Sequence, residues 1–259
     1  MGSIRLVCLL VCLVGYGFAA AEEAAEKVPA RYLVGVENID YRPFQNGLSG
    51  RFEGFGRDLL DAFAEDAGIQ FDYLPMPPSR LLASLLRDRI DFKYPDDPSW
   101  RPELRVGHDI QYSRPIVDYL DGTLVPPSRV GDPISKIRTL GAIIGFAPVA
   151  WVGRIEAGQL TLMENADLSA LFQQVLAGRL DAAYANIAVA KVQSERIFGN
   201  AEALVYDPRL PHATGQYRLS SRHHAEVLVR FDRWLLENAE RVSRLKRRAG
   251  LTDPPGLSD

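Results

Sequence analysis

A regular alternation of apolar runs and helical patterns constrains the fold more than any other feature of the chain. Strand-like apolar runs at residues 32–36, 69–73 and 90–94 enclose amphipathic helical patterns at residues 58–67 and 79–86. A strand–helix–strand order predicts parallel strands whose connecting helices cover the sheet. The first half of the chain is therefore expected to form an α/β unit.

A second series of the same kind begins near residue 139. Its expected strands cover residues 142–146, 160–163 and 180–184, and its expected helices cover residues 148–157, 168–176 and 186–197. Two comparable α/β units in one chain predict two lobes. Folds of this class bind ligands in the cleft between lobes and at the carboxyl ends of strands.

The start of the chain has the pattern of a secretory signal peptide. A positively charged beginning is followed by a mostly apolar run at residues 6–18, by three alanines and by an acidic segment that begins at Glu22. The run is shorter than the ~20 apolar residues of a membrane span. We expect a cleaved signal peptide over residues 1–21 and a periplasmic mature protein; an uncleaved anchor is the less favoured alternative. Cys8 and Cys12 both lie in the signal, so no disulfide is expected in the mature protein.

The composition argues against several classes of function. The chain carries 30 basic and 33 acidic side chains, a net charge of −3, which gives no support for nucleic-acid binding. The sequence contains no zinc pattern, nucleophile elbow or phosphate-binding loop, and its 4 histidines lack metal-ligand spacing. We therefore expect neither a metal nor a cofactor.

Five short segments follow one another in an order that is typical of one family of binding proteins. They are DYRPF at residues 40–44, GRFEGFGRDL at 50–59, LASLLRDRID at 82–91, YSRP at 112–115 and LAGRLDAAY at 176–184. In these segments the chain resembles the extracellular solute-binding proteins of family 3, receptors that deliver amino acids and similar small polar solutes to ABC importers. The resemblance covers roughly residues 31–250. It implies a two-lobed periplasmic-binding-protein fold of type II, in which each lobe is a sheet flanked by helices.

The resemblance also implies how the chain is divided. Lobe I would consist of residues 31–122 and 217–251, lobe II would consist of residues 123–216, and two strands near the boundaries would form the hinge. Closure of the lobes around one small polar solute is the expected motion. The implied partner is an ABC permease of the inner membrane, and we expect the binding protein to be a monomer.

Three arginines are candidates for binding an acidic group of the ligand, because the arginine fork matches a carboxylate. Arg105 fits the family spacing to the YSRP segment best, and Arg101 is its rival. Arg80, at the start of the second helical pattern, is the third candidate. For each arginine, a surface position or a salt bridge is the alternative role.

Aromatic residues form the second group of candidates. Tyr41 and Phe44 match the positions that cover the ligand side chain in the family, whereas Tyr94 stands where the family has small residues. A tyrosine or tryptophan can cover a ligand or stack on a cation, so Trp100 and Trp151 are candidates as well. Packing in the hydrophobic core is the alternative for these residues.

Asn186 occupies the position of the acidic residue that binds the ligand ammonium in the family. An asparagine lacks the negative charge, and a buried ammonium without a charge partner is costly. Either another acid replaces it, or the ligand is not a standard α-amino acid. The alternative role of Asn186 is to cap the following helix.

A transport receptor, not an enzyme, is the first expectation for the function. The same fold also serves a few exported enzymes, such as cyclohexadienyl dehydratases, which need an acid in the cleft to donate a proton. Glu164 and Asp167, near the mouth of the second lobe, are candidates for that acid. A solute sensor without an importer is the third alternative.

Overall fold

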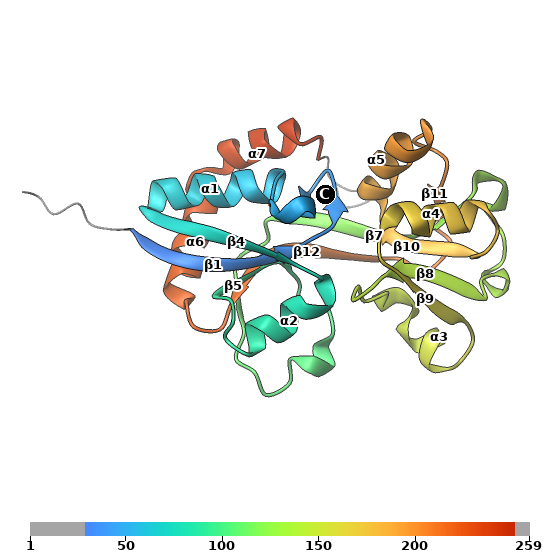
Figure 1. Cartoon of the computed structure of the whole chain (residues 1–259), viewed down its shortest axis with the longest axis horizontal. Coiled ribbons are helices and arrows are strands. Elements are labelled where there is room, and N and C mark those ends of the chain that lie inside the picture. Colours follow the sequence, from blue (N-terminus) through green and yellow to red (C-terminus); the bar gives the residue numbers. More distant parts are fainter. Residues whose placement is uncertain (1–28, 252–259) are drawn as a thin grey trace, which may run out of the picture.

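The computed structural model describes residues 29–251 of the chain (Figure 1). The predicted signal peptide over residues 1–21 lies outside the described residues. None of the helices within residues 29–251 combines the length and the apolar content that a membrane crossing requires.

Three parallel strands form the centre of lobe I. Strand β1 (Ala30–Glu37) pairs with β4 (Ile69–Met76) on one side and with β5 (Phe92–Asp96) on the other. Helices α1 (Phe55–Ala67) and α2 (Pro78–Leu86) lie on opposite sides of these strands (Figure 1). The strands run toward the middle of the molecule, so their carboxyl ends face the other lobe (Figure 1).

Lobe II repeats this architecture. Its parallel strands β10 (Ala182–Asn186), β8 (Thr139–Ile143) and β9 (Thr161–Asn165) are neighbours in that order. The helices of this lobe are α3 (Val152–Glu156), α4 (Leu168–Leu176) and α5 (Ile187–Phe198). Helices α4 and α5 lie on one side of the strands, and α3 lies on the other (Figure 1).

Two long antiparallel strands join the lobes. Strands β7 (Val117–Val125) and β12 (Ala213–Ser221) pair with each other; β12 also pairs with β5, and β7 also pairs with β10. One sheet therefore runs through both lobes in the order β4-β1-β5-β12-β7-β10-β8-β9. This architecture confirms the predicted α/β fold of two lobes joined by two strands. The predicted lobe boundaries fall inside β7 and β12.

Shorter strands and two C-terminal helices complete the molecule. They are β2 (Asp40–Tyr41), β3 (Gln45–Asn46), β6 (Gln111–Tyr112), β11 (Val205–Tyr206), α6 (Ala225–Glu237) and α7 (Ala239–Arg248). Helix α6 packs on β12 and on α1, and α7 packs on α1, so the end of the chain returns to lobe I.

The helices of lobe I follow from local sequence signals. In α1, Leu59, Leu60 and Phe63 recur at helical spacing and are buried, and each such burial contributes roughly 1.5–3 kcal/mol. Gly68 ends α1 in the left-handed conformation, with a φ of 62°. Helix α2 begins at Pro78, earlier than a cap at Ser79 predicts, because proline suits a first helical turn whose N–H groups have no helical partner.

Candidate functional site

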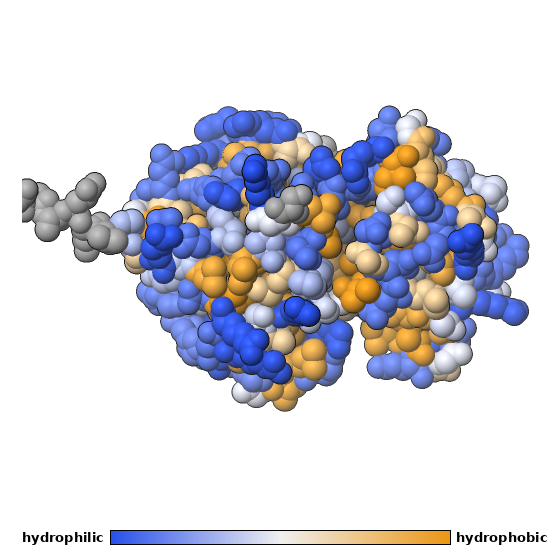
Figure 2. Space-filling model, viewed as in Figure 1, coloured by the Kyte–Doolittle hydropathy of each residue, from blue (hydrophilic) through white to orange (hydrophobic). Residues whose placement is uncertain are grey.

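A cavity lies between the two lobes, at the carboxyl ends of β1 and β5. Its lining residues are Glu37, Tyr41, Pro78, Leu81, Leu82, Lys93, Pro95, Trp100, Arg101 and Arg105 from lobe I, Tyr217 from the hinge, and Gly145, Phe146 and Ala147 from lobe II. Its interior volume is about 60 Å³, and about 10–15 Å³ is enough for one water molecule. Figure 2 shows a notch in the outline where the lobes meet, with apolar side chains along the boundary. The cavity therefore suits one small solute.

The lobes touch each other around this cavity. A φ of 86° at Gly145 turns the chain, so β8 ends at Ile143 instead of at the predicted residue 146. Gly145 packs on the first turn of α2, where an added Cβ atom would lie 2.4 Å from the backbone nitrogen of Ser79. The backbone N–H of Asn186 in lobe II donates a hydrogen bond to the Tyr41 hydroxyl in lobe I, with 3.2 Å between nitrogen and oxygen. The lobes are therefore closed.

Asp40 makes a second polar contact between the lobes. Its carboxylate lies 3.2 Å from Nη2 of Arg196 in α5, and its backbone carbonyl accepts a hydrogen bond from Nε2 of Gln193 at 3.1 Å. Burial acts to raise the pKa of Asp40, but Arg42 and Arg196 outweigh burial and hold that pKa below its usual value. The carboxylate is thus ionised when the lobes are closed at neutral pH.

The two buried cations of the cavity wall share one carboxylate. Nζ of Lys93 donates a hydrogen bond to Asp96 at 2.6 Å and another to a backbone carbonyl. The Arg105 guanidinium donates to both carboxylate oxygens of Asp96, at 2.7 and 3.1 Å. Burial acts to raise the pKa of Asp96, but Lys93 and Arg105 outweigh it and hold the pKa below its usual value. Both cations therefore have a partner in Asp96, and the group of three side chains keeps one net positive charge.

Glu37, the last residue of β1, brings an acid to the cavity. Glu37 is only 5% exposed. Its Oε2 atom accepts a hydrogen bond from Nε2 of Gln45 at 2.7 Å. Burial raises the pKa of Glu37 to about 7, although Lys93 acts in the opposite direction. In the described part of the chain, Glu37 forms no ion pair, in contrast to Asp96.

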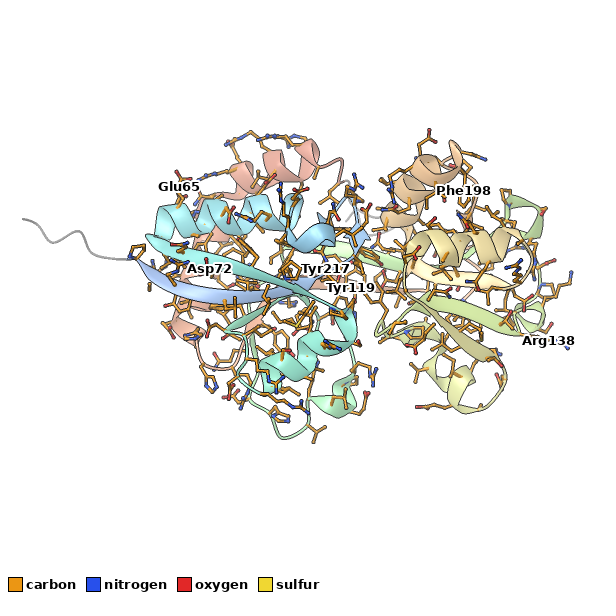
Figure 3. The ribbon with its side chains drawn as sticks, in the orientation of Figure 1. Glu65, Asp72, Tyr119, Arg138, Phe198 and Tyr217 are labelled. Atoms are coloured by element: carbon orange, nitrogen blue, oxygen red, sulfur yellow. The ribbon has the colours of Figure 1, made fainter. Side chains whose placement is uncertain are left out.

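Aromatic rings form much of the remaining wall. Tyr41 of lobe I and Phe146 of lobe II meet edge to face, with 5.3 Å between ring centroids. Tyr217 stacks on Tyr119 with 4.8 Å between centroids, where the two hinge strands pass from lobe to lobe (Figure 3). The cavity therefore combines a few charged side chains with aromatic walls contributed by both lobes and by the hinge.

A second buried acid, Asp121, lies in the hinge strand β7. It pairs in the sheet with Asn186, and burial raises its pKa to about 7, an effect that a hydrogen bond from the Asn186 side chain opposes. The Oδ1 atom of Asp121 has no hydrogen-bond partner among residues 29–251. No cluster of His, Cys, Asp and Glu side chains within those residues has the arrangement of a metal site.

Among the predicted ligand contacts, Tyr41 and Arg105 line the cavity. Trp100 and Arg101, named as further candidates, line it as well. Arg80 is exposed on α2 and is not among the lining residues. The structure thus brings two candidate arginines and two candidate aromatic residues to one place.

The other candidates lie in the protein interior, outside the cavity lining. Phe44 and Tyr94 are buried in the core, and the indole N–H of Trp151 donates to Thr123 at 2.9 Å. Oδ1 of Asn186 accepts hydrogen bonds from two backbone N–H groups in the first turn of α5, which is the alternative role of a helix cap. Ligand contact stays a prediction for these residues.

The two acids proposed for a catalytic role also lie outside the cavity lining. Glu164 accepts a hydrogen bond from the backbone N–H of Gly145 at 3.3 Å. Asp167 caps α4 by accepting from the N–H of Ala170 at 2.8 Å. Both carboxylates therefore have structural partners.

Sequence reasoning missed Glu37, Lys93 and Phe146. Glu37 directly follows the first expected strand, and ligands of such folds bind at the carboxyl ends of strands, so this signal was present. Lys93 lies within an expected strand and Phe146 at the end of another. Because their neighbours are mostly apolar, neither residue was distinguished from the core of its strand.

The chain is similar to known proteins in its fold and not in its sequence. No family model matches the sequence, and no curated protein matches it. An ancestral arginine-binding protein bound to arginine is 20% identical, with a TM-score of 0.67 over 85% of this chain and 98% of that chain. A periplasmic His/Glu/Gln/Arg/opine family-binding protein from Silicibacter pomeroyi in complex with lysine is 17% identical, with a TM-score of 0.65 over 84% of this chain and 95% of that chain.

A third similar structure is the ancestral amino acid-binding protein AncCDT-1, a precursor of cyclohexadienyl dehydratase. It is 18% identical, with a TM-score of 0.65 over 85% of this chain and 95% of that chain. The chain therefore has the two-lobed fold that is found in amino-acid-binding proteins of ABC transporters.

Proposed function

We propose that the chain is a periplasmic solute-binding receptor. It takes one small polar solute, an amino acid or a related compound, into the cavity between its lobes and delivers it to an ABC permease of the inner membrane. The observation that carries this proposal is a cavity that both lobes build, with Glu37 and Lys93 from lobe I and Phe146 from lobe II. A solute in such a cavity is enclosed by closure and released by opening.

The contacts between the lobes support a reversible closure. They include the hydrogen bond between Asn186 and Tyr41 and the ion pair between Arg196 and Asp40, both of which water can replace when the lobes separate. The connection through β7 and β12 lets each lobe keep its own sheet and helices during this motion.

A thermal-unfolding screen of the purified mature chain tests the proposal. The panel holds amino acids, opines, polyamines, small carboxylates and small organic cations. A solute at 100 times its dissociation constant stabilises the folded state by ~2.7 kcal/mol. A rise in the unfolding temperature with one chemical class supports the receptor, and an unchanged temperature across the whole panel contradicts it.

One observation favours a second function, that of an exported dehydratase. Glu37 is a buried acid in the cavity with a pKa of about 7, and such a group can hold a proton at neutral pH and donate it to a leaving group. The similar structure AncCDT-1 is a precursor of cyclohexadienyl dehydratase. Turnover of prephenate or arogenate that Glu37→Gln abolishes would favour the enzyme, and binding without turnover would favour the receptor.

A further inference from the structure

The cationic side chains of the cavity wall already donate most of their hydrogen bonds to other groups of the protein. Lys93 uses two of its three N–H donors, and Arg105 uses four of its five, in hydrogen bonds to Asp96 and neighbouring oxygens. Arg101, which is exposed, pairs with Glu103 at 2.8 Å. A ligand therefore finds few unused N–H donors on this side, although Lys93 and Arg105 share a single carboxylate.

The acidic side chain of the cavity, Glu37, has fewer partners within the protein. Glu37 accepts one hydrogen bond, from Gln45, and takes part in no ion pair among residues 29–251. Its pKa of about 7 reflects burial of the carboxylate, which the charge of Lys93 offsets only in part and without forming an ion pair with Glu37. A cation that loses its own water beside this carboxylate supplies the missing partner.

The hydrogen-bonding capacity of the cavity limits which cation fits. The lining side chains that can accept a hydrogen bond from a ligand are Glu37, Tyr41 and Tyr217. A guanidinium brings five N–H donors and a primary ammonium brings three. A buried N–H donor that finds no acceptor weakens binding. A nitrogen whose hydrogens are replaced by alkyl groups avoids this cost.

The aromatic wall suits the same kind of ligand. Aromatic rings attract cations, and cages of aromatic rings recognise quaternary ammonium groups. Nζ of Lys93 already lies 5.2 Å from the centroid of the Trp100 ring. The rings that remain for a ligand are those of Tyr41, Phe146 and Tyr217, which come from lobe I, lobe II and the hinge.

We infer that the cavity binds a compact organic cation whose charge lies on an alkylated nitrogen. Glu37 is its counter-charge, and the rings of Tyr41, Phe146 and Tyr217 surround its alkyl groups. This inference rests on the proposed function, because it names the ligand class of the same cavity. A ligand held in this way contacts both lobes and so stabilises their closure.

Isothermal titration calorimetry on the purified mature chain tests this inference with three probes of similar size. Choline carries the alkylated cation, 3,3-dimethylbutan-1-ol is its neutral carbon analogue, and ethanolamine is its unalkylated analogue. We expect choline to bind about 30-fold more tightly than the neutral analogue and about tenfold more tightly than ethanolamine. Equal affinities for choline and the neutral analogue, or no binding of choline, would overturn the inference.

Two matched substitutions then assign the effect to Glu37. Glu37→Gln keeps the size of the side chain and should remove the preference for choline over the neutral analogue. The control Glu65→Gln makes the same change in an exposed residue of α1, away from the cavity (Figure 3), and should keep that preference. If Glu37→Gln does not fold, as circular dichroism would show, the comparison of choline with its neutral analogue on the unsubstituted chain still decides.

The test also separates this inference from the receptor proposal. Tight binding of an amino acid such as arginine or glutamine together with weak binding of choline overturns the inference and leaves the receptor standing. Failure of every solute in the thermal screen overturns both.

Discussion

The hydroxyl oxygen of Tyr41 in lobe I lies 3.2 Å from the backbone nitrogen of Asn186 in lobe II and accepts its hydrogen bond. The same tyrosine lines the cavity and meets Phe146 edge to face. One side chain thus takes part both in the contact between the lobes and in the wall of the cavity. We therefore expect Tyr41 to couple closure to solute binding.

Tyr41→Phe should weaken solute binding about tenfold. The substitution keeps the ring but leaves the Asn186 N–H without a partner in the closed state, at a cost of about 1–3 kcal/mol. Calorimetric titration with the solute found in the thermal screen measures the change. Tyr32→Phe, in β1 and outside the cavity lining, is the control and should bind normally. Equal affinities of the two variants would show that the hydrogen bond does not hold the lobes closed.

Gly145→Ala should weaken binding by at least tenfold, because the new methyl group would lie 2.4 Å from the backbone nitrogen of Ser79 and keep the lobes apart. Gly158→Ala is a matched control in the same lobe. Gly158 also has a positive φ, 66°, but an added Cβ atom would have nothing within 4 Å. Both variants should therefore lose similar stability from backbone strain, and only Gly145→Ala should lose solute affinity. Loss of affinity in both variants would argue that strain, and not closure, is responsible.

The fold was predictable because its signals are local. The apolar periodicity of α1 and its end at Gly68 depend on neighbouring residues alone, and the structure has both. The site was less predictable because it combines residues that are distant in sequence. The spacing between Arg105 and the YSRP segment made Arg105 a candidate, and Arg105 lines the cavity. Its pairing with Asp96 was not predictable, because it depends on how the loop after β5 folds back.

Asn186 illustrates the same limit. Its position before a helical pattern predicts the cap that the structure contains, but no local signal tells whether its side chain reaches the cavity between the lobes. Glu37 could have been singled out, since it ends a strand that points to the cleft. Phe146 also ends an expected strand, but its contact with Tyr41 could not be predicted, because only the folded lobes bring the two rings together.

Glu37 should make the stability of the ligand-free protein depend on pH. Burial raises the pKa of Glu37 from 4.5 to about 7, so its contribution to stability is fully present below pH 4.5 and is lost as the pH rises through 7. We expect this group to lower the free energy of unfolding by about 3 kcal/mol across that interval. Denaturant unfolding of the unsubstituted chain and of Glu37→Gln between pH 4.5 and 8 measures it. Asp121 shifts in the same direction in both proteins, but the charge of Glu37 contributes to its raised pKa, so the difference between the curves also contains the coupling of these two acids. Parallel curves for the two proteins would contradict the prediction.

Asp96→Asn should destabilise the protein by about 3–5 kcal/mol, because it leaves two buried cations without their shared partner. The side chains of Lys93 and Arg105 are 6% and 9% exposed, and that of Asp96 is 0% exposed. The control Asp72→Asn breaks the exposed pair with Arg31 and should cost at most about 1 kcal/mol. Denaturant unfolding at pH 7 compares them, and equal losses would mean that the buried ions do not depend on Asp96.

Tryptophan fluorescence tests the central claim, that a solute enters the cavity between the lobes, most directly. Of the 3 tryptophans, Trp100 lines the cavity, whereas Trp151 and Trp234 are buried outside its lining. Titration with the solute panel should change the emission in a saturable way in the unsubstituted chain and in Trp234→Phe, and the change should be lost in Trp100→Phe. A panel that leaves the emission unchanged, or a saturable change that persists in Trp100→Phe, would contradict the account.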